Sequence, residues 1–159
     1  MQGFVILIHL FYIGIMQIIS TEDQDRIVQA ISLAEGKTSG EIRLVIEKKL
    51  NKEDAIQQAQ HYFVKLGMHK TAIRNGVLIY IAVEDHAFAI IGDVGINDRV
   101  PTDFWEKTKE EMAGYFREGH LADGLIAGIN DAGDQLKKFF PSRPDEINEL
   151  PDDIYFGNN

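Results

Sequence analysis

The chain of 159 residues contains no cysteine, which excludes disulfides, thiol nucleophiles and thiolate metal sites. It also lacks an excess of positive charge, because 16 Lys and Arg stand against 25 Asp and Glu and give a net charge of −9 at pH 7. No nucleic-acid partner is expected, since binding to a phosphate backbone needs a basic cluster. The length fits one domain that can fold without staples.

Several catalytic and cofactor motifs are missing as well. The sequence has no H-x-x-x-H or H-E-x-x-H pair for zinc and no D-x-[DN]-x-[DN]-G calcium loop. The stretch "GDVGIND" at residues 92–98 lacks the G-x-G-x-x-G spacing of a dinucleotide site. There is also no D-x-D-x-T nucleophile segment, so a phosphatase would have to use metal-bound water at a group of carboxylates.

The first 19 residues are strongly apolar but contain no Lys or Arg, whereas a secretory signal requires a positive first region. The apolar run over residues 3–15 is shorter than the roughly 20 residues of a membrane span. Three interpretations stay open: an upstream extension with Met16 as the native start, a signal or anchor, and a buried segment. We expect a cytoplasmic protein, and export or membrane association if residues 1–19 are a genuine anchor.

Apolar spacing divides residues 20–140 into helices and strands. Helices are predicted from the caps Thr21, Asn51 and Asp103, and a fourth helix follows over residues 121–140. Strands are predicted over residues 40–50, 75–85 and 86–93, with a tight turn between the last two. Strand, helix and strand in this order form a parallel unit, and the third strand pairs antiparallel. Residues 141–159, with three prolines and five acids, are predicted to be an extended acidic tail.

Acidic side chains follow the two parallel strands of this sheet. Glu47 ends the first strand, Glu84 and Asp85 end the second, and the junction of the last two helices returns Asp123 to the same edge. This is the edge where open α/β sheets tend to bind ligands, and carboxylates are ligands for Ca²⁺ and Mg²⁺. The four residues are therefore our first candidate cation site. A solvated hairpin tip is the alternative that needs no ligand.

A second candidate cation site lies at the opposite end of the sheet, where Asp93 and Asp98 flank a glycine-containing loop. Turn formation is the alternative for both residues, because Asp is favoured in such loops.

Two segments resemble a known family. "RNGVLIYIAVEDHAFAIIGDVGIN" at residues 74–97 and "FREGHLADGLIAGI" at residues 116–129 are similar to the TPM domain, found in plant thylakoid-lumen and bacterial proteins. The resemblance covers about residues 20–140 and implies a three-layer α/β/α sandwich with a small mixed sheet and about four flanking helices. It also implies candidate divalent-cation sites at acidic loop residues. Glu84 and Asp85 match the family's acidic pair, and Phe116, Arg117 and Gly119 match its Phe-Arg-x-Gly segment.

Two features depart from the secreted members of that family. Asn97 stands where an acid is usual, and the C-terminal membrane segment and glycine-rich tail of many bacterial members are not found here. Both departures resemble a soluble, cytosolic branch. We expect a domain that binds Ca²⁺ or Mg²⁺ and supports protein interaction or maintenance through an unidentified protein partner. The alternatives are a metal-dependent acid phosphatase, as some members are labelled, and an interaction domain without a cation site.

Overall fold

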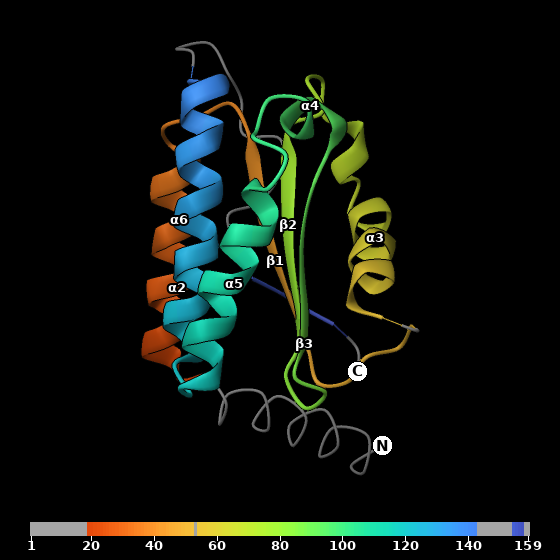
Figure 1. Cartoon of the computed structure of the whole chain (residues 1–159), viewed down its shortest axis with the longest axis vertical. Coiled ribbons are helices and arrows are strands. Elements are labelled where there is room, and N and C mark those ends of the chain that lie inside the picture. The colour runs from red at the N-terminus through yellow and green to blue at the C-terminus, as the bar shows by residue number, and fades with distance from the viewer. Residues whose placement is uncertain (1–18, 53, 143–153, 158–159) are drawn as a thin grey trace, which may run out of the picture.

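The computed structural model describes residues 19–52, 54–142 and 154–157 and shows a sheet between two layers of helices (Figure 1). The elements in chain order are α2 (Thr21–Glu35), β1 (Glu41–Glu47), α3 (Ala55–Lys65), the 3-10 turn η1 (Met68–Lys70), β2 (Gly76–Ala82), β3 (Ala87–Gly92), the single turn α4 (Val94–Asn97), α5 (Phe104–Arg117), α6 (Leu121–Phe139) and β4 (Ile154–Phe156). Helices α2, α5 and α6 cover one face of the sheet, and α3 covers the other. The predicted α/β/α sandwich is confirmed.

The sheet has the strand order β3-β2-β1-β4. β1 and β2 are parallel, with Leu44 opposite Ile79, and they are joined through α3. β2 and β3 are antiparallel, with Ala82 opposite Ala87 at the hairpin turn. The predicted parallel unit with an antiparallel hairpin strand is therefore confirmed. β4 was not expected, because the sequence around it was assigned to the acidic tail.

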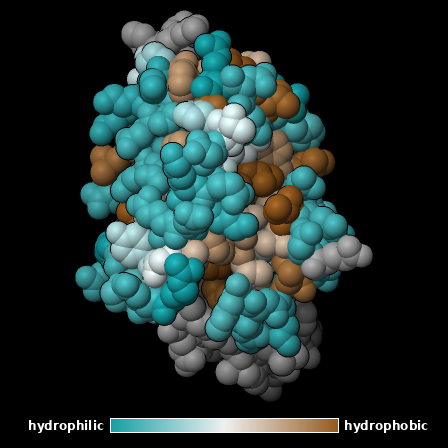
Figure 2. Space-filling model, in the orientation of Figure 1, coloured by the Kyte–Doolittle hydropathy of each residue, from teal (hydrophilic) through white to brown (hydrophobic). Residues whose placement is uncertain are grey.

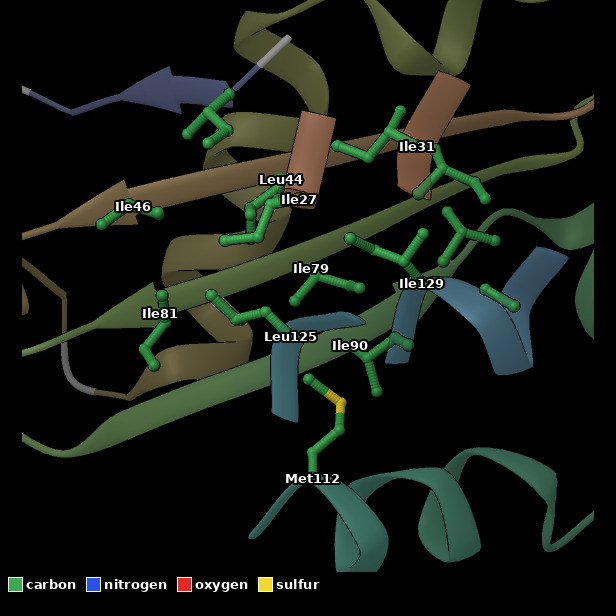
Figure 3. Packing of buried hydrophobic residues seen from close by; sticks show 14 of the residues in the cluster. Ile27, Ile31, Leu44, Ile46, Ile79, Ile81, Ile90, Met112, Leu125 and Ile129 are labelled. Atoms are coloured by element: carbon green, nitrogen blue, oxygen red, sulfur yellow. The ribbon is translucent and has the colours of Figure 1, made fainter. Parts of the chain in front are cut away.

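The larger core lies between the sheet and the layer of α2, α5 and α6. Every residue of β1 and β2 is buried, so both faces of these strands are covered. Figure 3 shows branched side chains from both layers interlocking in this core, with the thioether of Met112 entering from α5. The labelled residues are Ile27, Ile31, Leu44, Ile46, Ile79, Ile81, Ile90, Met112, Leu125 and Ile129.

Helix α3 begins later than the sequence suggested. Its N-cap is Asp54, whose carboxylate accepts a hydrogen bond of 2.8 Å from the backbone N–H of Gln57, and not Asn51. Apolar spacing predicts a buried face of Ile56, Ala59, Phe63 and Leu66 for this helix, and Ala59 and Phe63 are buried as predicted. Ile56, expected inside, is 49% exposed. The buried residues are Gln58, Ala59, Tyr62 and Phe63.

Two other caps also differ in detail. The N-cap of α2 is Ser20, which accepts from the backbone N–H of Asp23, and the predicted cap Thr21 is the first helical residue. Asp103 precedes α5 as predicted, but its side chain caps no backbone N–H and forms an ion pair of 3.0 Å with Lys107.

The apolar N-terminal segment lies almost wholly outside the described residues. Its last residue, Ile19, is buried in the larger core, and its carbonyl accepts a hydrogen bond from the side chain of Gln24. The three interpretations of residues 1–18 therefore stay predictions. Within the part of the chain that is described, no helix has the length and apolar character needed to cross a membrane.

Candidate functional site

The end of the sheet at which β1 and β2 finish holds the first group of predicted site residues. Figure 1 shows the β2–β3 turn and the α5–α6 junction at this same end, as the chain direction predicted. The side chains at this end nevertheless have different surroundings. Their partners decide what each can bind.

Glu84 and Asp85 lie exposed at the hairpin tip. Asp85 Oδ2 accepts a hydrogen bond of 2.5 Å from the backbone N–H of Leu50, and the N–H of Glu84 donates to the carbonyl of Lys48. These bonds fasten the tip to the segment that follows β1. The Nζ atom of Lys48 lies 3.7 Å from Glu84 Oε1, so a half-exposed ammonium partly neutralises the acidic pair.

Asp123 lies in the first turn of α6, and its side chain is 45% exposed. Its Oδ1 accepts a hydrogen bond of 2.7 Å from Arg26, which also contacts Asp23 at 2.9 Å. These hydrogen bonds, that to Asp123 foremost, raise the pKa of the Arg26 guanidinium. Arg26, Asp123 and His120 belong to the lining of a pocket of about 200 Å³ at this corner. Asp123 is thus paired within the helical layer and does not join the hairpin tip.

Glu47 faces the layer of α3 and is completely buried. Its Oε2 accepts hydrogen bonds from Tyr80 Oη at 2.6 Å and from Gln58 Nε2 at 3.0 Å, and its Oε1 accepts from Tyr62 Oη. The Oε1 atom of Gln58 is buried and has no hydrogen-bond partner among the described residues. This buried Glu47 cluster is a carboxylate held by three donors, the arrangement that a buried charge requires.

The two tyrosines of the cluster are chemically altered by it. Burial foremost, and then the hydrogen bond to Glu47, raise the pKa of the Tyr80 hydroxyl well above its usual range. The same two causes raise the pKa of Tyr62. Both hydroxyls therefore stay protonated and act as hydrogen-bond donors, and neither can serve as a base near neutral pH.

The second predicted pair lies at the opposite end of the sheet. Asp93 is 5% exposed, caps the single turn α4 by accepting from Val94 N, and accepts two hydrogen bonds from Arg74, of 2.6 and 2.8 Å. These bonds raise the pKa of the Arg74 guanidinium. Asp98 is exposed at the C-terminal end of the same turn. A cation here would have to displace a bidentate arginine from Asp93.

Asn97 explains one departure from the secreted members. Its Nδ2 donates to the carbonyl of Gly92 at 2.8 Å, and its Oδ1 accepts from Trp105 Nε1 at 2.8 Å. An aspartate could accept the indole hydrogen bond but could not donate to the carbonyl. The amide is therefore needed here for structure.

The Phe-Arg-x-Gly segment also has a structural use. The ring of Phe116 packs edge-on against Phe88 of β3, with ring centres 4.9 Å apart. Gly119 has a φ of +80° and ends α5, a backbone conformation that glycine adopts without strain. Arg117 is exposed in the last turn of α5, where a positive charge suits the helix dipole.

The structure does not bring the four carboxylates of the expected rim together. The described residues contain no group of three or more His, Asp or Glu side chains suited to hold a metal. Strand alternation turns Glu47 into the sandwich, and Arg26 holds Asp123 in the helical layer. Only Glu84 and Asp85 remain exposed at the hairpin tip.

Sequence reasoning missed the partners of Glu47. Alternation along β1 places Glu47 on the same face as Val45, and Val45 is paired with Tyr80 in the neighbouring strand. A glutamate on a covered face of the sheet must find hydrogen-bond donors, so this signal was present. The donors Tyr62 and Gln58 could not be identified, because they depend on where α3 starts.

The chain is similar to known proteins over most of its length. Residues 16–135 match the family model of the TPM domain. The solution structure of the BA42 protein from the psychrophilic bacterium Bizionia argentinensis shares 46% identity, covers 87% of this chain and 94% of its own, and has a TM-score of 0.79. No curated protein sequence gives a significant match.

Two more distant solution structures share the fold. The N-terminal domain of the cg2496 protein from Corynebacterium glutamicum has 15% identity and a TM-score of 0.61, with 82% of this chain and 81% of that chain covered. The N-terminal domain of a protein from P. gingivalis has 15% identity and a TM-score of 0.54, with 76% and 78% covered.

Proposed function

This chain belongs to the TPM domain family, and we propose that it acts by binding, with a weak divalent-cation site at its hairpin tip. Glu84 and Asp85 are the ligands, and Ca²⁺ or Mg²⁺ is the cation. The observation that carries the proposal is the exposed acidic pair fixed at the ligand end of the parallel strands by the hydrogen bond from Leu50 N to Asp85.

Two carboxylates and water are a sufficient ligand set for such a cation. Mg²⁺ keeps several of its waters and is commonly bound through one or two carboxylates, and weak Ca²⁺ modules bind at roughly 10⁻⁴ to 10⁻³ M. The hydrogen bond from Leu50 uses Oδ2 of Asp85, and the second oxygen of the carboxylate can coordinate. Glu47 and Asp123 are left out of the site, because each is held by donors of its own.

The positive charge of Lys48 should weaken the binding of a cation to the acidic pair. Its ammonium lies 3.7 Å from Glu84 Oε1 and must move away when a cation binds. The Lys48→Gln variant should therefore bind more tightly than the parent, and Asp85→Asn should bind more weakly. Asp134→Asn, at an exposed position of α6, removes the same charge as Asp85→Asn and is the matched control.

The experiment is thermal unfolding with and without 10 mM Ca²⁺ or Mg²⁺, together with backbone amide NMR shifts during titration. A dissociation constant of about 1 mM should stabilise the parent by about 1.4 kcal/mol at about 10 mM cation. The gain should increase in Lys48→Gln, stay in Asp134→Asn and vanish in Asp85→Asn, with shifts centred on Glu84–His86. An equal gain in all variants would move the site to Asp93 and Asp98, and no gain in the parent would remove the cation from the function.

An interaction domain without a cation is the second candidate, and the β3 edge favours it. β3 ends the sheet, and all six of its residues are uncharged. Figure 2 shows apolar side chains gathered over this strand, between the polar surfaces of α5 and α3. Natural edges usually carry charge or proline that prevents pairing, so an apolar edge invites a partner strand. If titration with Ca²⁺ or Mg²⁺ changes neither the stability nor the amide shifts, the interaction domain without a cation is the remaining function.

The phosphatase alternative would use water activated by the same cation. Phosphate release from a generic ester, measured with the cation and then with a chelator, tests it. Release that disappears in Asp85→Asn but continues in Asp134→Asn would support it, and release that is equal in both would contradict it.

A further inference from the structure

The last described segment of the chain lies on the outer edge of β1 as an added strand. Ile154, Tyr155 and Phe156 pair in parallel with Leu44, Val45 and Ile46. Gly157 continues the pairing, because its N–H donates to the carbonyl of Ile46 at 2.8 Å. This is the geometry by which an extended peptide adds to the edge of a sheet, with affinity from the main chain and specificity from alternate side chains.

The side chains of this segment alternate between the two faces of the sheet. Ile154 is 7% exposed and lies in the larger core, which Phe156 also packs against. Tyr155 points to the other face and contacts Tyr62 of α3, with ring centres 5.6 Å apart. The edge therefore accepts an aliphatic residue, an aromatic residue on the α3 side and a second aromatic residue on the core side.

The fourth position accepts only glycine. A Cβ atom on Gly157 would lie 2.2 Å from Cγ and 2.4 Å from Oε1 of Glu47, and 2.6 Å from Oη of Tyr62. Glu47 cannot move aside, because Tyr62, Tyr80 and Gln58 hold its carboxylate. The buried Glu47 cluster therefore selects glycine at this position, because any side chain would clash with Glu47 and Tyr62.

We propose that the outer edge of β1 and the Glu47 cluster form a docking site for an extended aliphatic-aromatic-aromatic-glycine segment, and that its occupant in trans is the C-terminal segment of a second copy of this chain. The segment with the required chemistry is the chain's own. The eleven residues 143–153 that connect it to the body can span up to roughly 36 Å when extended. That reach is enough for the strand to leave its own edge and pair with another.

Exchange between copies would keep every contact of β4. The same four residues would meet the same edge, so a reciprocal pair would differ from two separate copies mainly in the entropy of association. The tethered strand competes at an effective concentration in the millimolar range, so exchange should become visible only at high protein concentration. The site is independent of the cation proposed for the hairpin tip, because it lies on the opposite edge of the sheet from β3.

The first test measures whether the outer edge of β1 binds a peptide after the chain's own β4 has been displaced. In the full-length Gly157→Val variant the tethered segment cannot seat, so a fluorescent peptide with the sequence of residues 151–159 should bind. The wild type should bind the peptide at least about tenfold more weakly, because its own strand competes. A peptide carrying the same Gly157→Val change should not bind either protein. Gly114→Ala, which meets nothing within 4 Å, is a matched glycine control and should behave as the wild type.

A second variant serves as the receptor for the peptide if Gly157→Val does not fold. Ile154→Asp places a charge where the strand enters the core and frees the edge without crowding Glu47. Both receptors are checked by near-UV circular dichroism. Failure of the peptide to bind a folded receptor, or equal binding of the glycine and valine peptides, would overturn the docking site.

The second copy is tested by sedimentation of the wild type at about 10 μM and about 1 mM, the range in which a tethered strand begins to lose to one supplied in trans. A dimer fraction that rises with concentration and disappears in Gly157→Val supports the exchange. A wild type that stays monomeric at both concentrations, or a dimer that is unchanged in Gly157→Val, would overturn the assignment of the occupant.

Discussion

Replacing Tyr80 by phenylalanine removes one of three donors from a buried carboxylate and leaves the ring in place. The hydroxyl of Tyr80 donates to Glu47 at 2.6 Å, and both residues are 0% exposed. Hydrogen bonds to charged groups contribute about 1.5–3 kcal/mol, and a carboxylate that loses a donor cannot be rescued by water at this depth. We expect Tyr80→Phe to lower the free energy of unfolding by about 2 kcal/mol at pH 8.

The pH dependence of this difference is a sharper expectation. Burial and the bond to Glu47 raise the pKa of Tyr80 above the value of the unfolded chain, so its contribution is complete below pH 10 and is lost as pH rises further. Above about pH 10, Tyr80 lowers the free energy of unfolding by about 1.4 kcal/mol per pH unit, because only the unfolded chain releases the tyrosine proton. Tyr80→Phe lacks this loss. The difference between wild type and variant should therefore shrink by about 1.4 kcal/mol between pH 8 and pH 11.

Urea unfolding at pH 8, 9, 10 and 11, followed by far-UV circular dichroism, measures the difference. Tyr115→Phe is the control, because Tyr115 is 37% exposed on α5 and the loss of its hydroxyl should change stability little. A constant difference between wild type and Tyr80→Phe from pH 8 to 11 would show that the hydroxyl does not hold its proton in the folded state. A loss far below 1 kcal/mol at pH 8 would show that Glu47 does not need this donor.

Four further substitutions test other parts of the structure. The side chain of Asp131 foremost, together with burial, raises the pKa of Glu111 to about 7, so the folded chain binds this proton more tightly than the unfolded one. The contribution of Glu111 to the free energy of unfolding is complete below pH 4.5 and is lost as pH rises through about 7. Solvent screening keeps this contribution below about 1 kcal/mol. In urea unfolding, Glu111→Gln should remove this pH dependence. Gly95→Ala should destabilise by more than about 2 kcal/mol, because its Cβ would lie 2.5 Å from two backbone carbonyls, whereas Gly114→Ala in α5 should stabilise by about 0.5–1 kcal/mol in the same assay. Asp54→Ala should lower the thermal stability by about 1 kcal/mol through loss of the α3 cap, and an unchanged midpoint would contradict that role.

The helices, the parallel unit and the hairpin could be predicted from the sequence because their signals are local. Apolar residues at helical spacing mark α2 and α6, and the uninterrupted apolar run of β2 marks a strand that is covered on both faces. Chain direction then places the hairpin tip and the α5–α6 junction at one end, as the structure shows. These inferences need only the neighbours of each residue along the chain.

The candidate site could be predicted only in part. Glu84 and Asp85 lie at the tip as expected, because a turn between paired strands is itself a local feature. The fate of Asp123 depended on Arg26, which lies in another helix far away in the sequence. Spacing along the chain carries no information about such a partner. The sequence therefore predicted a rim of four carboxylates, whereas in the structure Arg26 holds Asp123 away from the hairpin tip.

By itself, the sequence determined the identity of the elements, their order and the end of the sheet at which the acidic hairpin lies. Only the tertiary structure decided that Glu47 faces inward to Tyr62 and Tyr80, and that the glycine closing over it comes from the opposite end of the chain. The physical reason is that periodicity reports which side of an element is buried, but not what is buried against it. A strand of three residues in an acidic tail has too little local signal to be recognised, and it becomes a strand because the edge of β1 supplies its hydrogen bonds.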